Sequence, residues 1–170
     1  HRHAAVAAGL GVFGKHTLTL TPQFGPRQRF ISVLTDAELP ADPMYSGSEL
    51  CPANCNACVK ACPLHSLDPN NPVSLKMGDR TFSYPKLDFM RCAWVEQYRL
   101  AAVDGREFYG CSFSEMPPEG EIKYEDVDQA LQKMAKADRL QYSGPNGMTD
   151  TLGECLRKCV EVFEARKKTK

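Results

Sequence analysis

The sequence has no excess charge of either sign, because 21 Lys and Arg residues balance 21 Asp and Glu residues in a chain of 170. Without a basic surplus, the chain has no electrostatic footprint for nucleic acid or for an anionic membrane surface, and neither partner is expected. It also lacks an apolar run long enough to span a bilayer, as well as internal repeats and low-complexity segments. Hydrophobic residues make up 42% and charged residues 25%, which is typical of a folded globular chain.

The amino terminus lacks both a secretory signal and an initiator methionine. The chain opens with His1 and continues directly into a helix-favouring segment. We therefore expect a truncated or processed amino terminus, and the presence of an export signal upstream is left open. For the chain as given, we expect a cytoplasmic location.

The pattern of apolar, glycine and proline residues predicts an α+β fold. Helices are predicted where apolar residues recur at helical spacing or alanine is abundant, over residues 3–9, 86–103, 124–140 and 151–167. Strands are predicted where β-branched and apolar residues gather, over residues 17–20, 29–34, 73–77 and 80–84. The last two strands flank Gly78-Asp79 and predict a hairpin. A loop over residues 37–50 separates the first strands from a segment that is dense in cysteine.

Cysteine is the residue type that the chain has in unusual number. Four of the eight cysteines fall within the segment CPANCNACVKACP. Such crowding suits a metal centre better than a disulfide framework. All eight are candidate metal ligands: Cys51, Cys55, Cys58, Cys62, Cys92, Cys111, Cys155 and Cys159.

The spacing in the first cysteine group is that of an iron–sulfur protein. Cys55, Cys58 and Cys62, followed by Pro63, form C-x2-C-x3-C-P, the end of the bacterial ferredoxin run. In that run, closely spaced thiolates surround one cubane and the last cysteine points towards a different cluster. Cys51 lies one residue farther from Cys55 than the usual first cysteine. A loop can absorb one extra residue, so Cys51 is kept as a ligand.

The second cysteine group is less regular. Cys155 and Cys159 lie four residues apart in a predicted helix, and their side chains therefore share one face. They match the end of a second ferredoxin run, although Leu152 stands where a further cysteine belongs. The isolated Cys92 and Cys111 complete the eight thiolates that two 4Fe–4S clusters require.

The cysteine pattern is also compatible with other roles for these residues. A structural zinc site with four cysteine ligands needs only two separated pairs. Disulfides would require an oxidising compartment and would leave the tight spacing unexplained. Cys111 is also consistent with an inert, buried thiol that packs as a small hydrophobic side chain.

Several motifs resemble a known family. The stretch HRHAAVAAGLGVFGKHTLTLTPQFGPRQRFISVLTDAELPADP, followed by CNACVKACP and LDFMRC, resembles the carboxy-terminal part of epoxyqueuosine reductases and corrinoid reductive dehalogenases. The resemblance covers most of residues 1–100 and returns at GECLRKC. Its most specific part is AGLG-x-x-GK together with GPR-x-R-F and T-D.

The resemblance implies a cobalamin-binding, nitroreductase-like domain followed by a two-cluster ferredoxin module that reduces the corrinoid cobalt. Residues 1–40 would be a remnant of the first domain, and residues 41–170 would form the iron–sulfur domain. By the family pattern, one cluster is held by Cys51, Cys55, Cys58 and Cys159. The other is held by Cys62, Cys92 and Cys155, with Cys111 as the candidate for the eighth ligand, which the family places near Leu152.

The family's catalytic residue and most of its corrinoid domain lie upstream of the AGLG element, so no catalytic residue is assigned. Lys15, His16, Arg27 and Arg29 are candidates for contact with a corrinoid tail or phosphate. A role as ordinary solvated strand and turn residues accounts for them equally well.

These observations predict a ferredoxin-like two-cluster module with flanking helices and a small remnant sheet. Its expected function is electron transfer through two 4Fe–4S clusters to a corrinoid centre, as part of an anaerobic, cobalamin-dependent reductase. The expected partners are an electron-donor protein of ferredoxin or flavodoxin type and a corrinoid-binding domain or subunit. With that domain the protein would be an oxidoreductase, and without it an electron-transfer module. The alternative is a zinc-stabilised structural or interaction module without redox activity.

Overall fold

The computed structural model describes residues 1–98, 100–101, 115–136 and 153–168. The chain divides into two compact units. The first comprises His1–Ala61, Leu67–Lys86 and Glu154–Lys170, and the second comprises Cys62–Ser66 and Leu87–Gly153. Within the part of the chain that the structure describes, no helix combines the length and the apolar character needed to cross a bilayer.

The first unit begins with α1 (Arg2–Ala7), which forms in an alanine-rich segment. The chain leaves this helix through Gly9, whose φ of 77° lies in the left-handed region that commonly ends helices. Val6 of α1 is fully buried and forms a small core with Phe13 and Tyr84. This predicted helix is confirmed.

A short hairpin follows α1. Strand β1 (Val12–Phe13) pairs antiparallel with β2 (Thr19–Leu20), with Val12 opposite Leu20. The strand predicted over residues 17–20 is thus present, but its partner lies before it in the sequence. The strand predicted over residues 29–34 is wrong.

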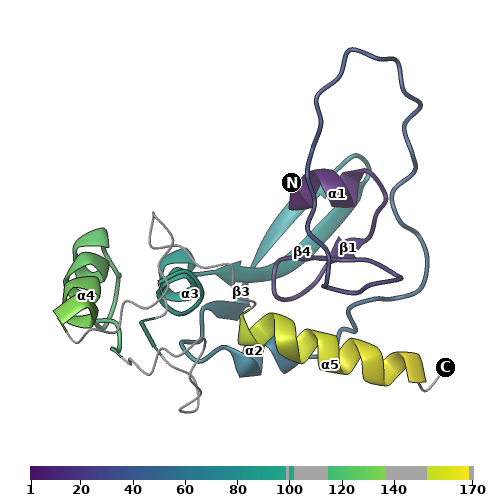
Figure 1. Cartoon of the computed structure of the whole chain (residues 1–170). Coiled ribbons are helices and arrows are strands. Elements are labelled where there is room, and N and C mark those ends of the chain that lie inside the picture. The colour runs from purple at the N-terminus through teal and green to yellow at the C-terminus, as the bar shows by residue number, and fades with distance from the viewer. Residues whose placement is uncertain (99, 102–114, 137–152, 169–170) are drawn as a thin grey trace. The chain divides into compact units, whose positions relative to one another are not determined.

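Residues 29–34 instead belong to a long loop that rises away from the sheets and helices of the first unit (Figure 1). Ile31, Val33 and Leu34 are 80%, 78% and 98% exposed. Their β-branched character favours a strand, but a strand also requires a neighbouring edge to which its backbone can bond. The described sheets contain only two strands each, and residues 29–34 pair with neither of them.

The predicted hairpin around Gly78-Asp79 is confirmed and is longer than expected. Strand β3 (Leu67–Met77) and strand β4 (Arg80–Leu87) form the second two-stranded sheet. Gly78 has a φ of 59°, a conformation that a two-residue hairpin turn requires and that glycine adopts without strain.

Two helices position the candidate site of the first unit. Helix α2 (Ala57–Ala61) follows the first cysteines, and α5 (Glu154–Lys168) packs alongside it, as the blue and yellow ribbons of Figure 1 show. The prediction of a last helix is confirmed, with a start at Glu154 rather than at residue 151. Residues 151–152 lie outside the described part of the chain.

The second unit contains α3 (Phe89–Glu96) and α4 (Tyr124–Lys136). Asp88 caps α3, because its carboxylate accepts a hydrogen bond from the Arg91 backbone N–H at 3.0 Å. A hydrophobic core fills the unit, formed by Leu64, Trp94, Leu100, Ala101, Ile122, Val127, Ala130 and Met134.

Helix α3 is shorter than the predicted span of residues 86–103. The backbone N–H groups of Tyr98 and Leu100 turn back to the carbonyls of Ala93 and Trp94, which closes the helix and buries Leu100 completely. Helix α4 buries Val127, Ala130 and Met134 on one face, as its spacing predicts, and residues 137–140 lie outside the described part. Helices with two small antiparallel sheets confirm the α+β class. The predicted domain boundary at residue 40 separates parts of the chain by their evolutionary origin, not by compactness, and it stays a prediction.

Candidate metal centre

The Cys51–Cys58 loop, residues 51–58, brings three thiols to the beginning of α2. Cys55 donates its backbone N–H to the Pro52 carbonyl at 3.0 Å, which closes a tight turn inside the longer spacer. Cys58 lies on α2 and is 5% exposed, whereas Cys51 and Cys55 are half-buried. The extra residue between Cys51 and Cys55 is therefore accommodated in a turn, as a one-residue bulge requires.

A fourth thiol comes from the other end of the sequence. Cys159 lies on α5, the helix that packs beside α2. Burial, followed by the neighbouring Cys58, Cys51 and Cys55, raises the pKa of the Cys159 thiol to about 12. Burial, followed by Cys51 and Cys55, raises the pKa of Cys58 to about 11. We call Cys51, Cys55, Cys58 and Cys159 the thiol quartet.

The chemistry of the quartet fits a positively charged metal group. Four thiolates gathered in a partly buried site repel one another and lose hydration, so they ionise together only when a cation compensates their charge. No disulfide joins Cys51, Cys55, Cys58, Cys62 or Cys159, which all remain as thiols. The donor set is thus available to a metal.

The spacing of the site differs from that of a single-ion site. Among the described residues, no group of three or more His, Cys, Asp or Glu side chains is gathered closely enough to hold one metal ion. A zinc ion draws its sulfur ligands to about 2.3 Å from one centre. A four-iron cubane is larger, because each thiolate binds its own iron atom at a different corner.

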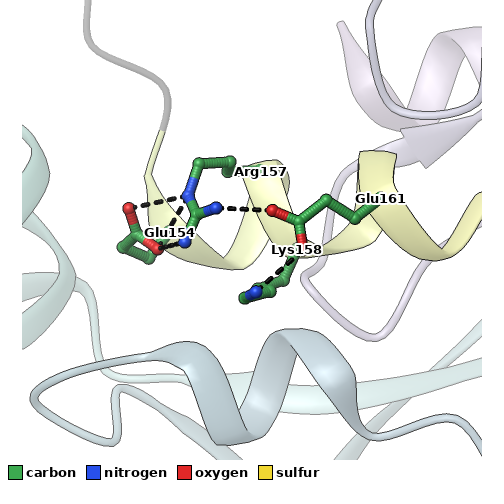
Figure 2. Close-up of polar contacts among 4 residues, drawn as sticks. All are labelled: Glu154, Arg157, Lys158 and Glu161. Atoms are coloured by element: carbon green, nitrogen blue, oxygen red, sulfur yellow. Dashed lines mark hydrogen bonds and ion pairs between the residues drawn. The ribbon is translucent and has the colours of Figure 1, made fainter.

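A network of charged side chains lies along the first turns of α5, which also contain Cys155 and Cys159 (Figure 2). The guanidinium of Arg157 donates to both carboxylate oxygens of the buried Glu154, and it also pairs with Glu161. Lys158 adds an ion pair with Glu161 at 2.7 Å. Pairs at this spacing stabilise a helix, and Glu154 in the first turn also interacts favourably with the helix dipole.

The remaining described cysteines are divided between the two units. Cys62 and Cys92 belong to the second unit, and Cys155 belongs to the first. The Cys92 thiol donates to the Glu96 carboxylate at 3.5 Å. Cys111 lies outside the described residues. The second cluster, with ligands from Cys62, Cys92, Cys155 and Cys111, therefore stays a prediction.

The surroundings of Cys62 contain polar groups suited to a cluster ligand. The Ser66 backbone N–H donates to the Cys62 sulfur at 3.2 Å, and backbone N–H bonds to sulfur are known to tune iron–sulfur clusters. The Ser66 hydroxyl is buried and has no hydrogen-bond partner among the described residues. A buried hydroxyl without a partner costs free energy, and the sulfur atoms of a bound cluster would recover it by accepting a hydrogen bond from the hydroxyl.

His16, one of the residues predicted to touch a corrinoid, is 4% exposed inside the loop between β1 and β2. Its Nδ1 accepts the Leu18 backbone N–H at 3.1 Å, so the ring proton lies on Nε2, which has no partner among the described residues. Burial lowers the pKa of His16 to about 4. The ring is therefore neutral at physiological pH.

We expect His16 to make the folded chain less stable as the pH falls. The folded pKa of about 4 lies below the ordinary value of 6.5, so the unfolded chain binds a proton that the folded chain does not. The contribution is complete above pH 6.5 and is lost as the pH falls towards 4. Between pH 8 and pH 5, the free energy of unfolding should fall by about 2 kcal/mol through this residue.

Urea unfolding of the wild type and of His16→Asn at both pH values measures this effect. Asparagine keeps an acceptor for the Leu18 N–H but does not titrate, so its pH slope should be flatter. The exposed His65→Asn is the control. An unchanged slope in His16→Asn would contradict the prediction.

The other predicted corrinoid contacts have partners of their own in the first unit. Lys15 donates to the Ala53 carbonyl at 2.6 Å and to the Asn56 side-chain oxygen at 3.0 Å. Arg27 forms an ion pair with Glu164 of α5. Arg29 is exposed on the long loop. Contact of these residues with a corrinoid stays a prediction.

Two features of the site were not visible in the sequence. The contact of Lys15 with the Cys51–Cys58 loop joins segments about forty residues apart, and no local pattern marks it. The Ser66 N–H reaches Cys62 because His65 adopts a φ of 52°, which is uncommon for a residue other than glycine.

The chain is similar in sequence to reductases. It is 36% identical over 107 residues to epoxyqueuosine reductase of Listeria monocytogenes, covering 63% of this chain and 26% of that protein. It is 36% identical over 97 residues to tetrachloroethene reductive dehalogenase of Dehalobacter restrictus, covering 52% and 17%. A tetrachloroethene reductive dehalogenase of Desulfitobacterium hafniense is 42% identical over 65 residues, covering 37% and 12%.

The resemblance predicted from the motifs is thereby confirmed, for both kinds of reductase. The chain spans only 26% or less of the length of these relatives. No protein-family model matches it, and no solved structure matches it significantly.

Proposed function

We propose that the chain is an electron-transfer module of a cobalamin-dependent reductase, with a ferredoxin-like core that holds two 4Fe–4S clusters. The observation that carries the proposal is the thiol quartet, in which α5 brings Cys159 to the three cysteines of the Cys51–Cys58 loop. A C-x2-C-x3-C-P run is typical of ferredoxins rather than of zinc sites. The similarity to two kinds of reductase supports a redox role.

The residues of the chain have distinct parts in this function. The quartet binds one cluster, and Cys62, Cys92, Cys155 and Cys111 bind the other. The Ser66 N–H and hydroxyl stabilise negative charge at Cys62 and its surroundings. Bound clusters of this type accept and release one electron at a time at potentials that hydrogen bonds and burial adjust. The side chains and backbone of the protein therefore set the reduction potentials of the two clusters, and these potentials set the direction of electron flow.

The partners follow from the same proposal. An external protein of ferredoxin or flavodoxin type supplies electrons, and a corrinoid-binding domain or subunit receives them. Residues 1–40 derive from that domain, and Lys15, His16, Arg27 and Arg29 would lie on its side of the module. No residue of this chain is assigned to substrate chemistry.

Anaerobic reconstitution with iron and sulfide tests the proposal. We expect about eight iron atoms and about eight acid-labile sulfides per chain, together with the broad visible absorbance of thiolate-bound clusters. Zinc at one or two atoms per chain without labile sulfide would refute it and would select the zinc-stabilised interaction module instead.

A further inference from the structure

Lys15 holds both spacers of the first cysteine run. Its ammonium group donates to the Ala53 carbonyl at 2.6 Å, in the spacer between Cys51 and Cys55. It also donates to the Asn56 side-chain oxygen at 3.0 Å, in the spacer between Cys55 and Cys58. The first of these spacers is the one with an additional residue. A single cation thus fixes the part of the loop that departs from the usual ferredoxin spacing.

The turn that presents Lys15 is built to stay in place. The Gly14 N–H donates to the Leu18 carbonyl and the Thr17 N–H donates to the Gly14 carbonyl, both at 2.8 Å. Thr17 has a φ of 69°, which is strained for a β-branched residue. Arg2 stabilises this conformation by donating to the Thr17 hydroxyl at 2.8 Å and to its carbonyl at 3.1 Å. Strain that the surroundings hold in place is commonly found at functional sites.

Two groups of opposite charge contact the spacer between Cys51 and Cys55. The ammonium group of Lys15 donates to the Ala53 carbonyl at 2.6 Å. Glu49 supplies the negative charge. Its carboxylate accepts the Ala53 N–H at 3.2 Å, so it contacts the same spacer as Lys15. Lys15 is thus a positive charge held on the loop that presents the thiols of Cys51, Cys55 and Cys58.

We propose that Lys15 is a positioning residue that holds the Cys51–Cys58 loop in its cluster-binding form and raises the reduction potential of the cluster bound by the thiol quartet. The inference rests on the proposed function and deepens it. Reduction adds one electron to the cluster without breaking a bond, and an external one-electron donor supplies it. The added negative charge is stabilised by a nearby cation, so the reduced form gains more from Lys15 than the oxidised form does.

Square-wave voltammetry of the reconstituted full chain tests this, with the electrode as the electron source. In Lys15→Gln, which removes the charge and keeps a hydrogen-bond donor, we expect one of the two cluster waves to move to a more negative potential. The ratio of reduced to oxidised cluster at a fixed potential should fall about tenfold, equivalent to about 59 mV for a one-electron couple. The second wave should not move.

Three variants provide matched controls. Lys15→Arg keeps the charge and should restore the wild-type potential. Glu49→Gln removes the opposing charge and should move the same wave in the positive direction. Lys60→Gln removes an equal charge from the exposed face of α2, where the ammonium has no hydrogen bond or ion pair within the described residues, and should leave both waves in place.

The outcomes separate this inference from the proposed function. A wild-type chain that binds no iron and sulfide refutes the proposed function itself. A wild type with about eight irons and a Lys15→Gln wave that stays in place, or that moves no more than in Lys60→Gln, overturns the inference alone. Loss of one cluster in Lys15→Gln but not in Lys15→Arg supports the holding role. Equal loss of the cluster in both variants overturns it, because Lys15→Arg keeps the positive charge that is proposed to hold the loop.

Discussion

Replacing Cys58 and Cys159 together by alanine is expected to remove about half of the iron that the reconstituted chain binds, from about eight atoms to about four. The two residues come from different helices, α2 and α5, and burial raises the pKa of both thiols strongly. Two remaining thiolates cannot hold a cubane that requires four ligands. The second cluster keeps all of its predicted ligands, so the loss should stop at half.

The matched control is the double variant Val59→Ala and Val160→Ala. These valines are the next residues on the same two helices and are half-buried, so their truncation disturbs the packing without removing a thiol. Iron and labile sulfide, measured for both variants after anaerobic reconstitution, give the comparison. Equal iron in the two variants, or complete loss of iron in the cysteine variant, would contradict the assignment of the quartet to one cluster.

The cysteine spacing could predict this site because its information is local. Cys55, Cys58 and Cys62 lie within eight residues, and the chemistry of a cubane restricts such spacings strongly. Cys159 was reached through the family pattern, and its position beside α2 follows from the packing of α5. The contacts of Lys15 and Ser66 could not be predicted from the sequence, because they depend on backbone conformations at Thr17 and His65 that L-residues seldom adopt.

The fold could be predicted where a segment determines its own structure. The hairpin at Gly78-Asp79 and the apolar face of α4 depend on a local turn and on a local period. The strand predicted over residues 29–34 is wrong because a strand forms only where a second segment pairs with its backbone. The side chains of Ile31 and Val33 are equally compatible with a strand and with the exposed loop observed. The predicted end of α3 is wrong for the opposite reason. The apolar residues continue at helical spacing, but the burial of Leu100 ends the helix early.

The position of Cys159 depends on the contact between α5 and a turn near the amino terminus. Phe163, one helical turn after Cys159, is buried against Gly25. A Cβ atom on Gly25 would lie 2.7 Å from Cδ1 of the Phe163 ring, which is closer than two carbon atoms can pack. The ion pair between Arg27 and Glu164 lies beside this contact. The glycine at position 25 therefore sets how closely the helix approaches.

We expect Gly25→Ala to destabilise the chain by about 3 kcal/mol and to lower the content of the quartet cluster. The cost has two sources, a φ of 60° that disfavours alanine and the clash with Phe163. Gly78→Ala is the matched control, because Gly78 has a φ of 59° but its added Cβ would meet, among the described residues, only the flexible end of Met44, at 3.4 Å.

The control should lose about 1 kcal/mol and keep its iron, since it carries the backbone strain without the clash. Urea unfolding and iron content of both variants measure the difference. If the two glycine variants were equally stable and bound equal iron, the approach of α5 would not depend on Gly25. A larger loss in Gly25→Ala, accompanied by loss of iron, would instead establish that a contact one helical turn away from the thiol determines where Cys159 stands.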